Sequence, residues 1–178
     1  MNLFLIRHTQ VDVETNICYG QTDVDLAATF STESKKVANR ITGIYFDKIY
    51  SSPLKRCRLL AENIFHEKEI VYDKKLMELN FGDWEMKTWD DIYFQPEGKV
   101  WMDNYHLFPT KNGESYPEMV KRIKEFYTKL TREPKENIAI ITHAGVIRIF
   151  KSIIENKPIK ELFSTFKPEY GSVLKLEV

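Results

Sequence analysis

Two histidines of this chain come directly after short apolar runs, where a buried strand would deliver polar side chains to one edge of a sheet. His8 follows Arg7 at the end of the run LFLI (residues 3–6), and His143 closely follows the run IAII (residues 138–141). A neutral imidazole can attack phosphorus and carry a phosphoryl group, and a guanidinium binds phosphate through paired N–H groups. These residue types indicate phosphoryl transfer if the fold brings them together.

A third polar cluster follows the run DKIY (residues 47–50) and leads into a helical pattern. Ser52 is placed to cap this helix and Pro53 to occupy its first position. Arg56 then falls in the first turns. The sequence therefore predicts a further cation at the same edge of the sheet.

Each group has an expected part in the reaction. Neighbouring arginines favour a neutral histidine, because like charge lowers the imidazole pKa. We therefore expect one histidine, in its neutral form, to be the nucleophile, and the second, in its charged form, to stabilise the phosphate oxygens. Glu78, in the stretch MELNFGDWE, is the candidate acid for the leaving oxygen, with Asp83 and Glu85 behind it.

Neither a metal nor another cofactor is expected. None of the four histidines has the close ligand spacing of zinc sites: His8, His66, His106 and His143. His66 and His106 are interpreted as structural. Cys18 and Cys57 show no metal or redox spacing, which favours reduced thiols.

Taken singly, each of these residues has a simpler interpretation. Arg7 and His8 could form a turn into solvent, and His143 could be a histidine at a helix start. Arg56 could lay its stem over the sheet, and Glu78 could be a surface carboxylate. The functional interpretation depends on their coincidence at three strand ends.

The elements that must position these residues follow from the apolar pattern. Short buried runs, each followed by a helical pattern, are typical of a parallel sheet in an α/β fold, where ligands bind at the carboxyl ends of the strands. Helices are predicted from about Ser31 to Gly43 and from about Tyr116 to Leu130. The second has Ser115 and Glu118 at capping-box spacing. Residues 172–178 alternate like an edge or final strand.

Residues 84–112 differ from the rest of the chain. They hold all three tryptophans and many other aromatic residues, without a clear period. A long irregular insertion in a compact domain is usually functional or disordered, and its aromatic content argues against disorder. We expect a lid over a pocket, although tryptophans are more often part of a core.

The composition limits the class of protein. A length of 178 residues favours one domain over residues 1–178, and 26 basic residues balance 26 acidic ones. A net charge of zero argues against a nucleic-acid or membrane surface. No signal peptide or bilayer-spanning stretch is recognised, so we expect a soluble cytoplasmic protein.

Five ordered motifs resemble the histidine phosphatase superfamily, also called phosphoglycerate mutase-like: LIRHT, SSPLKR, LMELNFGDWE, NGES and THAGVIR. The resemblance implies a three-layer α/β/α sandwich around a mostly parallel sheet, without a metal cofactor. It implies that His8 is the phosphorylated nucleophile and Glu78 the proton donor. Arg7, Arg56 and His143 would complete the phosphate pocket, and Ala144 opens the helix beside it.

The stretches CYGQTDVDLA (residues 18–27) and FGDWEM (residues 81–86) resemble α-ribazole phosphatases of cobalamin biosynthesis. Such an enzyme would remove a 5′-phosphate from a benzimidazole riboside, and an aromatic lid would suit stacking on the base. The partner would be a small phosphorylated metabolite, and a homodimer is left open. The alternatives are a phosphoglycerate mutase, a broad-specificity metabolite phosphatase, or a non-catalytic phospholigand-binding module.

The chain departs from the family pattern in two places. Thr9 replaces the usual glycine after the histidine, and its hydroxyl either faces the pocket as a donor or bonds to nearby backbone. Glu14 stands where the family has asparagine. The nearby Asn16, together with Tyr19 and Gln21, is a candidate substrate contact.

Overall fold

The computed structural model describes residues 1–105, 107–132 and 135–178, and it is built around a five-stranded sheet with the strand order β3-β2-β4-β1-β5. Four strands are parallel: β1 (Asn2–Arg7), β2 (Lys48–Ser51), β3 (Val71–Tyr72) and β4 (Asn137–Thr142). The last strand, β5 (Val173–Glu177), pairs antiparallel with β1 at one edge. The prediction of a mostly parallel α/β sheet is therefore confirmed, although the short β3 was not predicted.

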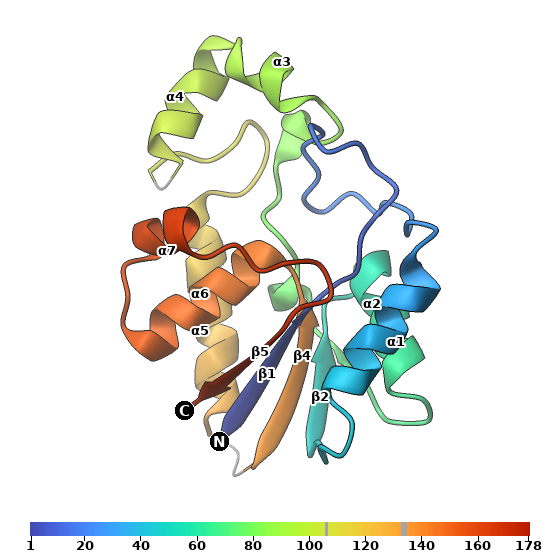
Figure 1. Ribbon diagram of the computed structural model, residues 1–178. Coiled ribbons are helices and arrows are strands. Elements are labelled where there is room, and N and C mark those ends of the chain that lie inside the picture. The colour runs from blue at the N-terminus through green and yellow to red at the C-terminus, as the bar shows by residue number, and fades with distance from the viewer. Residues whose placement is uncertain (106, 133–134) are drawn as a thin grey trace.

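Both faces of the sheet are apolar, which explains why its central strands are continuous hydrophobic runs. Along β1, Leu3 and Leu5 join one core cluster, and Phe4 and Ile6 join the other. Figure 1 shows the two helical layers. One layer holds α1 (Phe30–Arg40) and α2 (Lys55–Ile64), and the other holds α5 (Tyr116–Leu130), α6 (Ala144–Glu155) and α7 (Ile159–Thr165).

Helix α5 has the predicted bounds. Its capping box is present, since the Ser115 side chain accepts from the Glu118 backbone and the Glu118 carboxylate accepts from the Ser115 backbone. Helix α1 ends at Arg40, three residues before the predicted end at Gly43. Gly43 has a φ of +79°, so it lies in a turn.

The predicted start of α2 is wrong. The helix begins at Lys55 with Leu54 as its cap, so neither Ser52 nor Pro53 has the predicted role. The Ser52 backbone N–H donates to the Ile141 carbonyl at 2.9 Å, which keeps Ser52 in register with β4. Its hydroxyl contacts His143 instead of capping a helix.

The segment predicted as an irregular lid contains two short helices, α3 (Trp89–Tyr93) and α4 (Pro96–Asn104). Two 3₁₀ turns precede them, η1 (Lys74–Leu76) and η2 (Gly82–Trp84). Helices of five and nine residues are too short to establish a sequence period. Figure 1 shows α3 and α4 beyond the carboxyl ends of the central strands. His106 lies outside the described residues.

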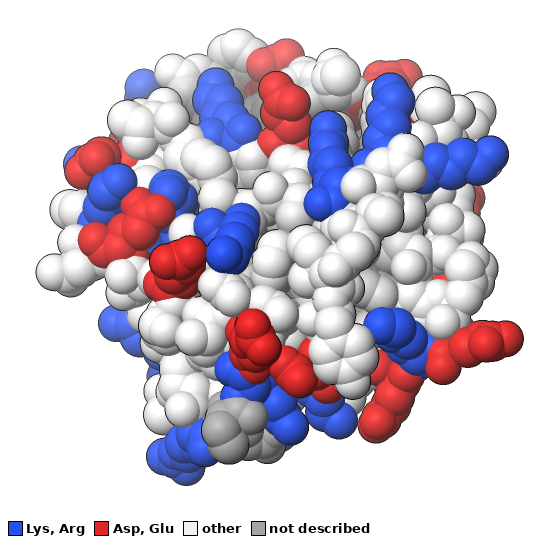
Figure 2. All heavy atoms as spheres, turned by 60° about the horizontal axis from the view of Figure 1, so that its bottom comes forward, with Lys and Arg blue, Asp and Glu red and all other residues white. Residues whose placement is uncertain are grey.

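Charges of both signs are interspersed on the surface that Figure 2 shows, where the bottom of Figure 1 is turned forward. This pattern agrees with the balanced composition. In the part of the chain that the structure describes, no helix is both long enough and apolar enough to cross a membrane.

Candidate active site

Adjacent strands bring the two histidines together. Arg7, the last residue of β1, pairs with Thr142, the last residue of β4, and the His8 backbone N–H donates to the Thr142 carbonyl at 3.0 Å. His143 follows as the cap of α6, and the two imidazole centroids lie 5.2 Å apart. The parallel register of β1 and β4 therefore creates the pair.

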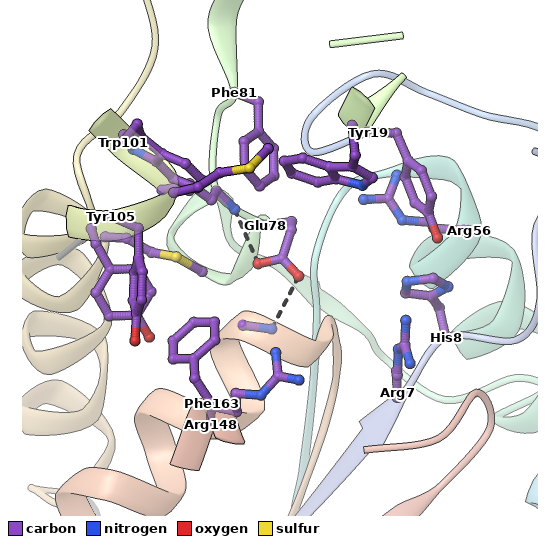
Figure 3. A pocket seen from close by; sticks show the side chains of 16 residues that line it. Arg7, His8, Tyr19, Arg56, Glu78, Phe81, Trp101, Tyr105, Arg148 and Phe163 are labelled. Atoms are coloured by element: carbon purple, nitrogen blue, oxygen red, sulfur yellow. Dashed lines mark hydrogen bonds between the residues drawn. The ribbon is translucent and has the colours of Figure 1, made fainter. Parts of the chain in front are cut away.

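A cavity of about 380 Å³ opens beside His8, a size suited to a small ligand. Its polar end includes Arg7, His8 and Arg56, which the sequence grouped together. The far wall is mostly aromatic and includes Phe81, Trp89, Trp101, Tyr105 and Phe163. Figure 3 shows Glu78 between these two ends.

His8 is oriented by its own neighbour. Its Nδ1 lies 2.8 Å from the Thr9 carbonyl, which can only accept, so Nδ1 carries the proton and Nε2 carries the lone pair. Burial lowers the pKa of His8 well below 6.5, and the charges of Arg56 and Arg7 lower it further. His8 is therefore neutral, as a nucleophile must be.

His143 is fully buried, and its Nε2 lies 2.9 Å from the Ser52 hydroxyl and 3.5 Å from the Cys57 thiol. Burial lowers its pKa well below 6.5, with smaller contributions from Arg56, His8 and Arg7. The direction of this shift disfavours the charged form that we expected for the second histidine, because burial and the nearby cations both oppose protonation of His143.

The two arginines of the polar end are held by backbone carbonyls. Arg7 Nη1 donates to Pro168 at 2.7 Å, and Arg56 donates to Gly20 at 2.6 Å and to Thr22 at 3.1 Å. In both side chains Nε is buried and has no hydrogen-bond partner among the described residues. A buried guanidinium without a counter-charge is costly, so this end of the cavity favours an anion.

Glu78 faces the cavity with its carboxylate fixed by two backbone amides. Oε2 accepts from the Gly145 N–H at 3.0 Å, and Oε1 accepts from the Leu79 N–H at 3.1 Å (Figure 3). A Cβ at position 145 would lie 2.3 Å from Glu78 Oε1. The approach of this carboxylate to the start of α6 therefore requires glycine.

Sequence reasoning missed Arg148 as a cavity residue. Its Nε donates to the Phe166 carbonyl at 3.0 Å, and its guanidinium lies over the Phe163 ring at 4.8 Å. Burial lowers its pKa, and the nearby Glu78 opposes this shift. The sequence does contain a signal for this residue: Arg148 is a single cation within the apolar helical run AGVIRIF, one turn after Gly145.

Of the remaining candidates, only Tyr19 lines the cavity. The Asn16 amide donates to exposed Asp90, and the Gln21 amide donates to the Glu78 carbonyl. Thr9 is fully buried, and its hydroxyl has no partner among the described residues. Neither Thr9 nor Ala144 lines the cavity, so neither side chain reaches it.

The acidic residues near Glu78 also lie outside the cavity. Glu85 accepts from the backbone N–H groups of Gln21 and Thr22 and so fixes that loop. Asp83 is exposed and accepts from Asn112. Glu78 is therefore the carboxylate that this cluster contributes to the cavity.

Residues 1–105, 107–132 and 135–178 hold no group of three or more histidine, cysteine, aspartate or glutamate side chains that could bind a metal ion. Both cysteines are buried and unpaired with each other. Burial raises the pKa of the Cys57 thiol to about 12, which keeps it protonated beside His143.

Comparison with known proteins gives one family. The model of the histidine phosphatase superfamily (branch 1) matches residues 3–178. Adenosylcobalamin/alpha-ribazole phosphatase of Escherichia coli K12 is 25% identical over 178 residues, which cover 96% of this chain and 87% of that protein. Phosphoserine phosphatase 1 of Hydrogenobacter thermophilus is 25% identical over 154 residues, which cover 83% of this chain and 73% of that protein.

Solved structures show the same fold. The alpha-ribazole phosphatase of Shigella flexneri superposes with a TM-score of 0.93 at 22% identity, and the match covers 100% of this chain and 91% of that one. The three-layer arrangement predicted from the motifs is therefore confirmed.

Proposed function

Because this chain belongs to the histidine phosphatase superfamily (branch 1), we propose that it hydrolyses phosphomonoesters through a phosphohistidine formed on His8. The observation that carries the proposal is the orientation of His8. Its Nδ1 proton is bound to the Thr9 carbonyl, so the lone pair on Nε2 is available in a cavity that Arg7 and Arg56 also line.

In the first step, Arg7 and Arg56 bind the phosphoryl oxygens, and their buried Nε–H groups gain acceptors. His8 Nε2 attacks phosphorus in line as the ester P–O bond breaks. Glu78 enters this step protonated and transfers its proton to the leaving oxygen, so an alcohol departs. The Gly145 N–H holds the carboxyl group in place during the transfer.

In the second step, water attacks the phosphorus of phospho-His8. Glu78, now a carboxylate, accepts a proton from that water, and the P–N bond breaks to release inorganic phosphate. His8 returns to its neutral form and Glu78 to its protonated form. The charge on the transferring oxygens is stabilised throughout by groups that are already in position, which lowers the barrier to phosphoryl transfer.

The substrate that we propose is α-ribazole 5′-phosphate. The aromatic wall of the cavity supports this choice, because Phe81, Trp89 and Trp101 offer ring faces and edges to a flat base. The names of the related E. coli and S. flexneri proteins point the same way. Kinetic competition should rank α-ribazole 5′-phosphate above phosphoserine in kcat/KM. Net conversion of 3-phosphoglycerate without phosphate release would instead indicate a mutase.

His8→Ala should lower phosphatase activity on the order of a thousandfold or more, because the nucleophile is lost. The measurement is hydrolysis of phenyl phosphate in the presence of a metal chelator, together with ³²P labelling of the protein, quenched in alkaline detergent. Wild-type protein should carry base-stable, acid-labile label on His8. His66→Ala is the matched control, since His66 is exposed and should not affect either readout. Label that persists in His8→Ala would rule out His8, and full loss of wild-type activity on chelation would contradict the metal-free reaction.

A further inference from the structure

Two tyrosines from distant parts of the chain meet beside the arginines of the cavity. The hydroxyl groups of Tyr19 and Tyr170 lie 2.7 Å apart and form a hydrogen bond across 151 positions of sequence. Tyr19 lines the cavity, as Figure 3 shows, and Tyr170 precedes β5. We refer to this hydrogen-bonded pair as the tyrosine bridge.

Each ring of the tyrosine bridge supports one arginine. The guanidinium carbon of Arg7 lies 3.8 Å from the centroid of the Tyr170 ring, and that of Arg56 lies 5.3 Å from the centroid of Tyr19. The negative face of an aromatic ring attracts a cation, more strongly where water is excluded. One hydrogen bond therefore joins two cation–ring pairs.

Backbone contacts fix Tyr170 relative to the end of β1. The Gly171 N–H donates to the His8 carbonyl at 3.1 Å, and the Arg7 N–H donates to the Ser172 carbonyl at 3.0 Å. The Pro168 carbonyl accepts from the Arg7 side chain. The segment from Pro168 to Ser172 therefore lies against Arg7, and these contacts fix the backbone on both sides of Tyr170.

The two arginines come from different elements, since Arg7 ends β1 and Arg56 lies in the first turn of α2. Their like charges repel, and a phosphoryl group undergoing transfer needs donors at fixed separations. We propose that the tyrosine bridge positions Arg7 and Arg56 and so sets the spacing of the donors that bind the phosphoryl oxygens. This proposal rests on the proposed function, because it assigns no ligand other than the phosphoryl group.

Tyr19→Phe and Tyr170→Phe test the bridge, because each removes one hydroxyl and keeps the ring. Each variant should lose about fivefold in kcat/KM, the size expected for one hydrogen bond. Both changes delete the same bond, so the double variant should fall no further than either single variant. Orthovanadate mimics the five-coordinate phosphorus of phosphoryl transfer. In each variant, inhibition of the phosphatase by orthovanadate should weaken more than the binding of inorganic phosphate, which is measured by calorimetry.

Tyr170→Leu also removes the ring, so it should lose about a further fivefold in kcat/KM relative to Tyr170→Phe. Tyr45→Phe is the control, because Tyr45 is 73% exposed and its ring contacts Lys68 rather than an arginine of the cavity. It should leave kcat/KM and anion affinity unchanged. Circular dichroism and melting temperature show whether each variant is folded.

Two results would overturn the proposal in folded variants. Additive losses in the two single variants would show that the hydroxyls act independently, and equal weakening of vanadate and phosphate would show a general effect on anion binding. Failure of the proposed function is seen separately, as absence of ³²P on His8 in wild-type protein. The calorimetric binding of phosphate needs no transfer step and still reports on the tyrosine bridge.

Discussion

At the scale of single residues, one backbone carbonyl decides what His8 can do. The Thr9 carbonyl holds the Nδ1 proton, and the reactive Nε2 is left with its lone pair. The threonine side chain takes no part in this contact, so the replacement of the usual glycine leaves the orienting carbonyl in place. Glu78 is fixed in a similar way, by the backbone amides of Leu79 and Gly145.

Glu78→Gln should slow the hydrolysis of alkyl phosphates far more than the hydrolysis of aryl phosphates. Glutamine cannot donate a proton to the leaving oxygen, and an alkoxide needs that proton more than a phenolate does. We expect losses of about a hundredfold for ribose 5-phosphate and less than about tenfold for phenyl phosphate, measured as the pre-steady-state burst of alcohol or phenol release.

Asp83→Asn is the matched control for this prediction, because Asp83 is an exposed carboxylate of the same segment. Asp83→Asn should leave the rate of hydrolysis of both esters unchanged. Equal slowing of the alkyl and aryl esters in Glu78→Gln would count against Glu78 as the acid.

At the scale of elements, the end of β1 and the first turn of α2 supply the cationic end of the cavity, and short helices supply much of the aromatic end. Helices α3 and α4 pack closely because of one glycine. A Cβ at Gly98 would lie 1.8 Å from the Ile92 carbonyl oxygen. This contact holds the segment that contributes Trp89, Trp101 and Tyr105 to the cavity wall.

Gly98→Ala should therefore displace α3 and α4 and weaken the binding of substrates that contact the aromatic wall. An overpacked contact of this kind should raise KM for α-ribazole 5′-phosphate about tenfold and change KM for phenyl phosphate less. Tryptophan fluorescence should report the displacement. Val100→Ala, an exposed position on the same helix, should change neither KM nor fluorescence. If the Gly98→Ala protein had altered fluorescence but an unchanged KM, the position of α3 and α4 would have no influence on substrate binding.

At the scale of the whole molecule, folding buries two histidines among arginines at the carboxyl ends of the central strands. Burial and like charge lower the pKa values of His8 and His143 well below 6.5. The unfolded chain, with ordinary histidines, therefore binds more protons than the folded protein below that pH. The sign follows from linkage: stability is retained above pH 6.5 and is lost as the pH falls below it.

The free energy of unfolding, measured by urea titration, should fall by up to about 1.4 kcal/mol per pH unit for each of these histidines as the pH drops below about 6.5. His8→Gln should reduce this slope by the contribution of one histidine, about 1.4 kcal/mol per pH unit. His66→Gln is the matched control, since it replaces an exposed histidine. The same slope in His8→Gln and wild-type protein would contradict a depressed pKa at His8.

The sequence by itself determined the elements whose periods are long or whose runs are strongly apolar. Helix α5 and its capping box, the three central strands and the grouping of Arg7, His8 and Arg56 all followed from local pattern. The reason is that buried faces and strand ends impose regular spacing on the chain. Helices α3 and α4 and strand β3 could not be predicted in this way. Each is too short for its apolar residues to show a helical or strand period.

Only the tertiary structure decided which side chains act on one another. Ser52 contacts His143 instead of capping α2, because backbone pairing with β4 draws it along the sheet. Burial among cations lowers the pKa of His143, and no local pattern records the charges that surround a residue. Arg148 and the hydroxyl contact of Tyr19 with Tyr170 depend on packing between segments distant in sequence. Spacing along a chain specifies which face a residue occupies, whereas charge state and side-chain partners depend on distances that exist only after folding.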